Sequence, residues 1–464
     1  MDILITGGTL VTMDRQRRVI ENGAVAVKGD RIAAVGDAEE LSSRVSAGKV
    51  IDAAGKVVLP GLVNTHTHLF QGLLKGLGDD RVLVDWFRQV TGPSAARLLP
   101  DDCYQAARLG CLESIRSGAT TLVDFMYPHA GPGLSDPIIQ AFQESGLRGI
   151  YARGYVDWGV DDGVPPAIIE QAADALADCR RLFETYHGSA GGRIHIWAAP
   201  CMIWTQTAEG LMATRRLADQ CGMRITIHVA ETPFELANAR RRFGLKDLEY
   251  MAQIGFLGPD VLAVHGVYLD ARDIRIMKHF DVKLSHNPVS NMYLSSGVAP
   301  VPEMLAAGIT VGLATDGPAS NNNQNMIQSL KFAALLHKAD TKDPTVITAE
   351  KVLEMATIDG ARALGLEEEI GSIEEGKKAD LIVLDLNNPF AAPVHHPVSA
   401  LVYAATGNEV ETVLIDGRPV MEKGRVLTLD EASVLEKAQA AAVALAERAG
   451  TIHLSRRPWR SLAY

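Results

Sequence analysis

The chain reads Lys56-Val57-Val58-Leu59-Pro60-Gly61-Leu62-Val63-Asn64-Thr65-His66-Thr67-His68 through an apolar run that ends in two histidines one residue apart. Residues i and i+2 of an extended segment project to the same face, so His66 and His68 can present two ring nitrogens to one point. The pair alone is weak evidence for a metal site, because two histidines on one strand face are about as often ordinary hydrogen-bonded residues. It becomes strong only if later strands supply the missing ligands.

From Val57 onward, strand patterns alternate with helical patterns, as they do in βα units built around a parallel sheet. Eight strand candidates each end at polar or small residues. They cover residues 57–63, 120–125, 149–153, 193–198, 224–228, 261–265, 282–285 and 310–314. Eight such units predict an α/β fold of the (β/α)8 or TIM-barrel type, whose usual size is ~250 residues. In that fold, the chemistry belongs at the C-terminal ends of the strands.

Short strands separated by glycine-rich breaks fill the N-terminal region, and strand patterns return at residues 381–385 and 413–420. Because these β-rich ends flank the barrel in sequence, we expect them to pair into one composite β-sandwich. The predicted organisation is an N-terminal part of the sandwich at 1–58, the barrel at 59–368, and the remainder of the sandwich with a late helix at 369–464.

The composition is that of an ordinary globular protein, with 464 residues, 47% of them hydrophobic, and a mean hydropathy near zero. The formal net charge of -11 is spread along the chain and argues against nucleic acid as a partner. Five cysteines without a Cys-x-x-Cys pair fit reduced thiols in a cytoplasmic compartment. We see no signal-peptide pattern and no apolar run of membrane-spanning length, so we expect no membrane association.

The later strand ends supply further ligand candidates. Strand five ends at His228 and is followed by Glu231, strand six ends at His265, strand seven is followed by His286, and strand eight is followed by Asp316. Imidazoles and a carboxylate therefore converge on one end of the barrel. Nitrogen and carboxylate oxygen without a thiolate suit Zn²⁺, with Fe²⁺ also possible, and a site that keeps one position open is catalytic.

A set of motifs runs through nearly the whole chain. They are the N-terminal strand block, Pro60-Gly61-Leu62-Val63-Asn64-Thr65-His66-Thr67-His68, the His228-x-x-Glu231 pair, His265, Ser285-His286-Asn287-Pro288-Val289-Ser290-Asn291, Thr315-Asp316-Gly317, and Gly371-Ser372-Ile373-Glu374 with Gly376-Lys377. Together they resemble the amidohydrolase superfamily, in its cytosine deaminase-like branch of ring aminohydrolases, related to S-adenosylhomocysteine deaminases and triazine hydrolases. The resemblance implies a barrel with a composite β-sandwich and suggests a homo-oligomer.

The resemblance also implies one divalent metal ion held by His66, His68, His228 and Asp316. It implies that His265 contacts the attacking water or the developing tetrahedral centre, and that Glu231 is the proton shuttle. Some family members hold two metal ions bridged by a carboxylated lysine at the end of strand four. Here that end reads Ala198-Ala199-Pro200-Cys201, without a lysine, so we expect a single metal ion.

The residue chemistry is consistent with a deaminase. Asp316 can take a proton from the attacking water, and Glu231 can protonate a ring nitrogen beside the carbon under attack. We therefore predict a metal-dependent aminohydrolase that replaces an amino group on an N-heteroaromatic ring with oxygen and releases ammonia. Glu231, His265 and Asp316 are its predicted catalytic residues.

Five residues are candidates for contact with a small heterocyclic substrate. They are Gln71, Trp86, His129, His286 and Asn291. An exposed aromatic side chain on a loop can stack on a planar ring, but Trp86 can equally pack its own loop down. A hydrogen-bonding role within its turn is about as plausible for His286 as a substrate contact.

The leaving group and the ring stay open at this point. Relatives acting on S-adenosylhomocysteine and methylthioadenosine usually carry a ribose-binding glutamate soon after the tryptophan of the first long loop. No acid follows Trp86 before Asp101 in this chain, so we predict a free pyrimidine, purine, pterin or triazine over a nucleoside. The alternatives are removal of chloride or an alkylamine from a triazine-type ring, cyclic amide hydrolysis, and a noncatalytic barrel that serves as a binding module.

Overall fold

A computed structural model describes residues 1–459 and 461, and it contains the predicted barrel. Eight parallel strands pair in sequence order. They are β6 (Leu62–Thr67), β7 (Ala119–Met126), β8 (Arg148–Tyr155), β9 (Ile194–Pro200), β10 (Ile225–Val229), β11 (Val261–His265), β12 (Lys283–His286) and β13 (Val311–Leu313). The first and last strands meet where the Thr65 hydroxyl donates to the Leu313 carbonyl at 3.1 Å. The Asp316 N–H also donates to the His66 carbonyl at 3.2 Å, so the circle closes beside the two histidines.

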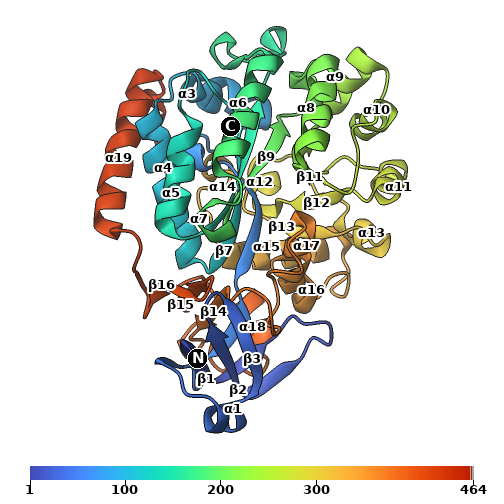
Figure 1. The fold of residues 1–464 in the computed structure, drawn as a ribbon. Coiled ribbons are helices and arrows are strands. Elements are labelled where there is room, and N and C mark those ends of the chain that lie inside the picture. The colour runs from blue at the N-terminus through green and yellow to red at the C-terminus, as the bar shows by residue number, and fades with distance from the viewer. Residues whose placement is uncertain (460, 462–464) are drawn as a thin grey trace.

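Helices surround the barrel, as Figure 1 shows. Because helices cover the outside of the strands, β6, β7 and β8 are buried along their whole length, polar residues included. The main helices are α4 (Pro100–Arg116), α5 (Ser135–Ser145), α6 (Ala172–Tyr186), α8 (Ala208–Cys221), α9 (Pro233–Phe243), α10 (Asp247–Gln253), α11 (Ala271–Phe280), α13 (Val301–Ala306), α15 (Met326–Thr341), α16 (Ala349–Met355) and α17 (Ile358–Leu364).

The two chain ends pair in one separate sheet, as predicted. Its nine strands are β1 (Ile3–Val11), β2 (Val19–Lys28), β3 (Arg31–Asp37), β4 (Lys49–Asp52), β5 (Val57–Pro60), β14 (Leu381–Leu384), β15 (Val410–Ile415), β16 (Arg418–Glu422) and β17 (Arg425–Val426). The ends meet where β5 runs antiparallel to β14. Ile5, Val25 and Leu381 belong to a hydrophobic cluster of this sheet's own. Helix α1 (Ala38–Arg44) packs against Leu4 and Ala26 of a second, smaller cluster.

The run from Val57 to Val63 is two strands, which corrects our expectation of one. The chain leaves the sheet after Pro60 and enters the barrel at Leu62, with Gly61 between them. A Cβ at Gly61 would lie 2.1 Å from the Thr120 hydroxyl, so this close approach to β7 requires glycine. The break was hidden in the sequence because both strands are fully buried and read as one apolar run.

A buried ion cluster joins the sheet to the N-terminal end of the barrel. The Arg148 guanidinium, at the start of β8, lies 3.1 Å from the Asp380 carboxylate and 2.5 Å from that of Asp416. Removing one partner would leave a buried charge uncompensated, so these contacts fix the relative position of the two parts. The sheet thus covers the bottom of the barrel and leaves the C-terminal strand ends free for chemistry.

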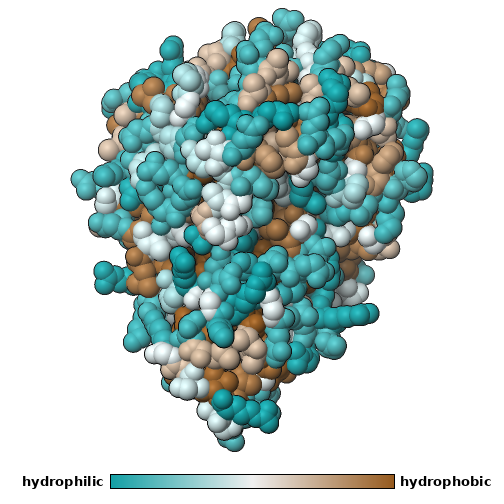
Figure 2. Space-filling view, viewed as in Figure 1, coloured by the Kyte–Doolittle hydropathy of each residue, from teal (hydrophilic) through white to brown (hydrophobic). Residues whose placement is uncertain are grey.

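The late helix, α19 (Glu431–Arg448), lies along the barrel, beside α4 in Figure 1. Arg448 pairs with Asp102, and Arg116 pairs with Glu431 at 3.0 Å. After α19 the chain turns through η6 (Ile452–Ser455). Hydrophilic side chains cover much of the face in Figure 2, with hydrophobic ones between them. Among the described residues, we find no helix that combines the length and the apolar character of a membrane span.

Candidate metal centre and active site

Four side chains from the C-terminal ends of β6, β10 and β13 meet inside the barrel mouth. The Asp316 carboxylate lies 3.4 Å from His66 Nε2 and 3.5 Å from His68 Nε2. The His228 Nε2 atom lies 3.3 Å from His68 Nε2. All four side chains are buried, so the group is shielded from bulk water.

The hydrogen bonds of these histidines turn their free nitrogens toward one another. His68 Nδ1 lies 2.5 Å from the Phe125 carbonyl, and His228 Nδ1 lies 2.7 Å from the Cys201 carbonyl. Because a carbonyl oxygen only accepts, each Nδ1 carries the hydrogen and each Nε2 presents a lone pair. Both ring nitrogens of His66 are buried without a hydrogen-bond partner. Lone pairs and a carboxylate that face one point fit a divalent cation.

The protonation states of these four side chains also fit a divalent cation. Burial lowers the pKa of His68 to about 3 and that of His228 well below its ordinary value, so both rings are neutral. Burial raises the pKa of Asp316, but the adjacent rings of His66, His265 and His68 hold it well below its usual range. The Asp316 carboxylate also accepts the Gly317 N–H at 2.7 Å and the Ser320 hydroxyl at 3.1 Å. Asp316 is therefore an oriented anion.

Glu231 lies at the end of β10, facing the histidines. Its carboxylate is 3.5 Å from His265 Nε2 and accepts the Ser296 hydroxyl at 3.1 Å. Burial, followed by the negative charge of Asp316, raises the pKa of Glu231 to about 8. A carboxyl with such a pKa carries a proton at neutral pH and can donate it.

Asn291 of α12 orients His265, and Ser296 in the turn after this helix orients Glu231. His265 has a φ of 71°, and its Nδ1 donates to the Asn291 side-chain oxygen at 3.0 Å, which leaves Nε2 free to face Glu231. Helix α12 (Pro288–Tyr293) carries Asn291, and Ser296 follows it. The backbone N–H of Glu231 donates to the buried Glu235 carboxylate at 3.0 Å. Neither Ser296 nor Glu235 was among the predicted residues.

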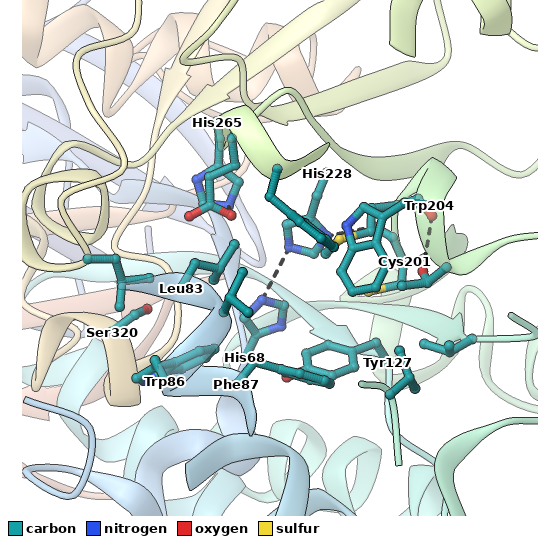
Figure 3. A pocket seen from close by; sticks show the side chains of 18 of the residues that line it. His68, Leu83, Trp86, Phe87, Tyr127, Cys201, Trp204, His228, His265 and Ser320 are labelled. Carbon is teal, nitrogen blue, oxygen red and sulfur yellow. Dashed lines mark hydrogen bonds and ion pairs between the residues drawn. The ribbon is translucent and has the colours of Figure 1, made fainter. Parts of the chain in front are cut away.

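A cavity opens directly above this group, and Figure 3 shows its walls. Its empty volume, including the mouth, is about 790 Å³, within the usual range of small-molecule sites. The first loop, defined here as residues 75–91, forms one wall with Leu83, Trp86 and Phe87, and Trp204 forms another. Most of the lining side chains are apolar.

Two of the five predicted substrate contacts line this cavity. The Trp86 indole N–H donates to the Ala319 carbonyl at 2.9 Å, so its ring is held in place with one side toward the cavity. Gln71 also lines the cavity and accepts the Ala319 N–H at 3.4 Å. A Cβ at Gly317 would lie 2.0 Å from the Gln71 side-chain oxygen, so glycine makes room for this amide.

The other three lie outside the cavity lining. His129 Nδ1 is 2.9 Å from the Arg153 guanidinium on the outer side of β8. His286 Nε2 is 3.1 Å from His337 Nε2 of α15. Asn291 lies behind His265, as described above. Each of these three residues is hydrogen-bonded to another side chain of the protein. We therefore assign them structural roles rather than substrate contacts.

Several cavity residues were not predicted. Tyr127 and Cys201 come directly after β7 and β9, where a strand-end rule could have found them. Trp204, Phe234 and Leu294 come from loops and short helices, and they have no sequence signal beyond being apolar.

Comparison with known proteins places this geometry in a family. Residues 57–420 match the model of the amidohydrolase family, and residues 23–44 match that of an imidazolonepropionase-like composite domain of bacteria. A 5'-deoxyadenosine deaminase of Methanosarcina acetivorans is 40% identical over 97% of this chain and 99% of its own length. A 5-methylthioadenosine/S-adenosylhomocysteine deaminase of Thermococcus onnurineus is 41% identical over 91% of this chain and 94% of its own length.

Solved structures agree. An adenosine deaminase from Xanthomonas campestris with bound zinc has a TM-score of 0.90 and 30% identity, covering 96% of this chain and 99% of its own. An atrazine chlorohydrolase from Arthrobacter aurescens, complexed with zinc, has a TM-score of 0.88 and 29% identity, covering 95% of this chain and 100% of its own. The fold, the matched residues and the buried histidine and aspartate group together imply a divalent metal ion at this site. The chain belongs to the amidohydrolase family.

Proposed function

We propose that this protein is a metal-dependent aminohydrolase that removes an exocyclic amino group from an N-heteroaromatic ring as ammonia. The observation that carries the proposal is the position of Glu231, a buried carboxyl with a raised pKa that faces both His265 and the cavity. The names of the deaminase relatives support the same reaction.

His66, His68, His228 and Asp316 would hold the metal ion, and we propose Zn²⁺. The nitrogen and carboxylate donor set suits Zn²⁺, and the adenosine deaminase from Xanthomonas campestris binds zinc. When bound, a divalent metal ion lowers the pKa of a coordinated water to about 7 and thereby supplies a nucleophile.

The protein's own residues would then move the protons. Asp316 accepts the proton that the attacking water loses. Glu231 protonates the ring nitrogen beside the attacked carbon, which makes that carbon more electrophilic. His265, fixed by Asn291, presents the lone pair of Nε2 in its neutral form and accepts a hydrogen bond from the attacking water. Asp316 returns the proton taken from the water to the amino group, which leaves as ammonia. The remaining O–H proton passes back to Glu231, and the oxygen stays on the ring as a carbonyl.

Ammonia release tests this proposal. The zinc-replete protein is screened against amino-substituted purines, pyrimidines, pterins and triazines. The Glu231→Gln variant keeps the shape of the side chain but loses its transferable proton, so we expect the rate on any hit to fall by about 10² or more. The exposed Glu209→Gln is the matched control and keeps the wild-type rate. An unimpaired Glu231→Gln variant would remove the residue from the mechanism.

The same screen identifies which ring is the substrate. The relatives named for 5'-deoxyadenosine and 5-methylthioadenosine favour an adenine ring with a sugar substituent. The lack of an acid soon after Trp86 and the apolar cavity wall made by Leu83 and Phe87 favour a free ring, as predicted from the sequence. Asp162 also lines the cavity, but its carboxylate already accepts hydrogen bonds from Arg241 and Asn238. Adenine compared with 5'-deoxyadenosine decides between them.

A second candidate reaction has its own support. The similarity to the atrazine chlorohydrolase and the apolar cavity walls favour a triazine that carries chloride or an alkylamine as leaving group. Detection of chloride or alkylamine in place of ammonia would select this reaction.

We also propose a cytoplasmic homo-oligomer. All five cysteines are free thiols, and four of them are buried, which is in keeping with a reducing compartment. Size measurement in solution tests the oligomeric state.

A further inference from the structure

We propose that Asp79 is a positioning residue that holds the first loop over the cavity by joining it to three other segments of the chain. The inference rests on the proposed function in one respect only, that the substrate occupies the cavity above Glu231.

Asp79 lies near the start of the first loop and accepts hydrogen bonds from two segments on the far side of the cavity. The Tyr293 hydroxyl of α12 donates to its carboxylate. The Asn322 amide donates to it at 3.1 Å, from the residue that follows α14 (Pro318–Asn321). Asn322 also accepts the Gly76 N–H at 2.8 Å, so the loop is held by its backbone as well.

The third segment is the C-terminal stretch after α19. The Arg457 guanidinium pairs with the Asp79 carboxylate and donates to the Gly76 carbonyl at 3.4 Å. The Asp79 side chain is 26% exposed, so these bonds are partly shielded from water. Burial raises the pKa of Asp79, but the bonds from Tyr293, Asn322 and Arg457 outweigh this and lower it, which keeps the carboxylate ionised. Three donors thus share one anionic acceptor, a strong arrangement for hydrogen bonds.

Residues that follow or precede the Asp79 contacts in the chain line the cavity. Leu83 and Trp86 follow Asp79 in the first loop, Leu294 follows Tyr293, and Ser320 lies two residues before Asn322. A displacement of the first loop from α12 would therefore open the cavity between Trp86 and Leu294. The Asp79 contacts fix the distance between these walls.

Helix α12 also connects the loop to the catalytic pair. Asn291 in α12 accepts the hydrogen of His265 Nδ1, and Ser296 just beyond it donates to Glu231. The Asn291 and Ser296 contacts lie on the barrel side and do not involve Asp79. Loosening Asp79 should accordingly weaken substrate binding and leave the geometry of Glu231 and His265 in place.

The test compares Asp79→Asn, Tyr293→Phe and the double variant with the wild-type zinc-replete protein. Asp85→Asn is the matched control, because Asp85 lies in the same loop and is exposed. The first readout is the split between KM and kcat on the best substrate of the ring panel. The second is the rate at which trypsin cleaves after Arg81 and Arg88 in the first loop, which needs no substrate.

We expect each single variant to raise KM about tenfold and to change kcat by less than about twofold. Trypsin cleavage in the loop should become about tenfold faster, because local opening becomes easier. The double variant should be no worse than the more affected single variant, since both remove one network. Asp85→Asn should match the wild type in both readouts.

An unchanged KM and unchanged cleavage in Asp79→Asn and Tyr293→Phe would overturn the inference. A joint loss of kcat, zinc content and thermal stability would also overturn it, because that pattern marks general destabilisation. If no ring of the panel is deaminated, the proposed function fails on its own, and the cleavage rates still decide whether Asp79 holds the loop.

Discussion

The Nε2 atoms of His68 and His228 lie 3.3 Å apart, and neither carries a hydrogen to donate to the other. Two lone pairs at this separation repel each other in a buried site unless a cation lies between them. The two nitrogens are therefore arranged as two ligands of one cation would be.

Metal binding should stabilise the fold. A ligand that binds only the folded state at a free concentration of 100 times its Kd adds about 2.7 kcal/mol to the free energy of unfolding. We expect the melting temperature of metal-free protein to rise when Zn²⁺ is added, as measured by thermal unfolding with metal analysis alongside. His68→Ala should lose both the zinc content and the rise, whereas the exposed His453→Ala should keep both. Full zinc content in His68→Ala would contradict the assignment of this ligand.

Replacing Asn291 should lower kcat and should have little effect on metal binding. Asn291→Ala leaves the buried His265 Nδ1–H without its acceptor, so the ring loses its fixed orientation. We expect kcat to fall by about tenfold to a hundredfold with zinc content unchanged. Asn291→Asp keeps an acceptor oxygen at the same place and should recover part of the rate. Equal rates for Asn291→Ala and wild type would show that His265 needs no partner.

The raised pKa of Asp124 predicts that the free energy of unfolding depends on pH. Its carboxylate accepts the Leu69 N–H at 2.7 Å, its second oxygen is buried without a partner, and burial raises its pKa from 3.8 to about 7. Between these two values the folded state binds more protons than the unfolded state, so the free energy of unfolding falls as the pH rises through this window. Above about pH 7 the buried Asp124 carboxylate is fully ionised, and its ionisation lowers the free energy of unfolding by an amount on the order of 2 to 4 kcal/mol.

Asp124→Asn removes the charge and keeps the acceptor for Leu69, so we expect it to stabilise the protein by about 2 to 4 kcal/mol at pH 8 and by little at pH 4. Denaturant unfolding at both pH values measures this. The exposed Asp161→Asn serves as control and should show no such difference. A variant that is equally or less stable than wild type at pH 8 would refute the prediction.

The sequence predicted the barrel because eight strand patterns that end at polar or small residues alternate with helical patterns. It predicted that His66, His68, His228, Glu231, His265 and Asp316 converge, since strand ends of a parallel barrel meet at one mouth. The structure brings these six residues together. Their roles as ligands and catalysts remain predictions for the experiments above.

The sequence failed where a side chain's direction depends on a distant partner. His286 follows the same strand-end rule as His265, yet it turns to His337, a residue 51 positions away. Ser296 holds Glu231 across 65 positions, and no local pattern marks it. Gly61 separates two strands only because Thr120 lies against it. Such contacts become visible only once the tertiary packing is known.

The pairing of β5 with β14 sets an order of events on the ribosome. β5 ends at Pro60 and its neighbour begins at Leu381, so every strand of the barrel is translated between them. At 5 to 20 residues per second this interval is roughly 15 to 65 seconds. Throughout it, the nascent chain leaves the β5 edge of its amino-terminal strands unpaired and open to pairing with other chains.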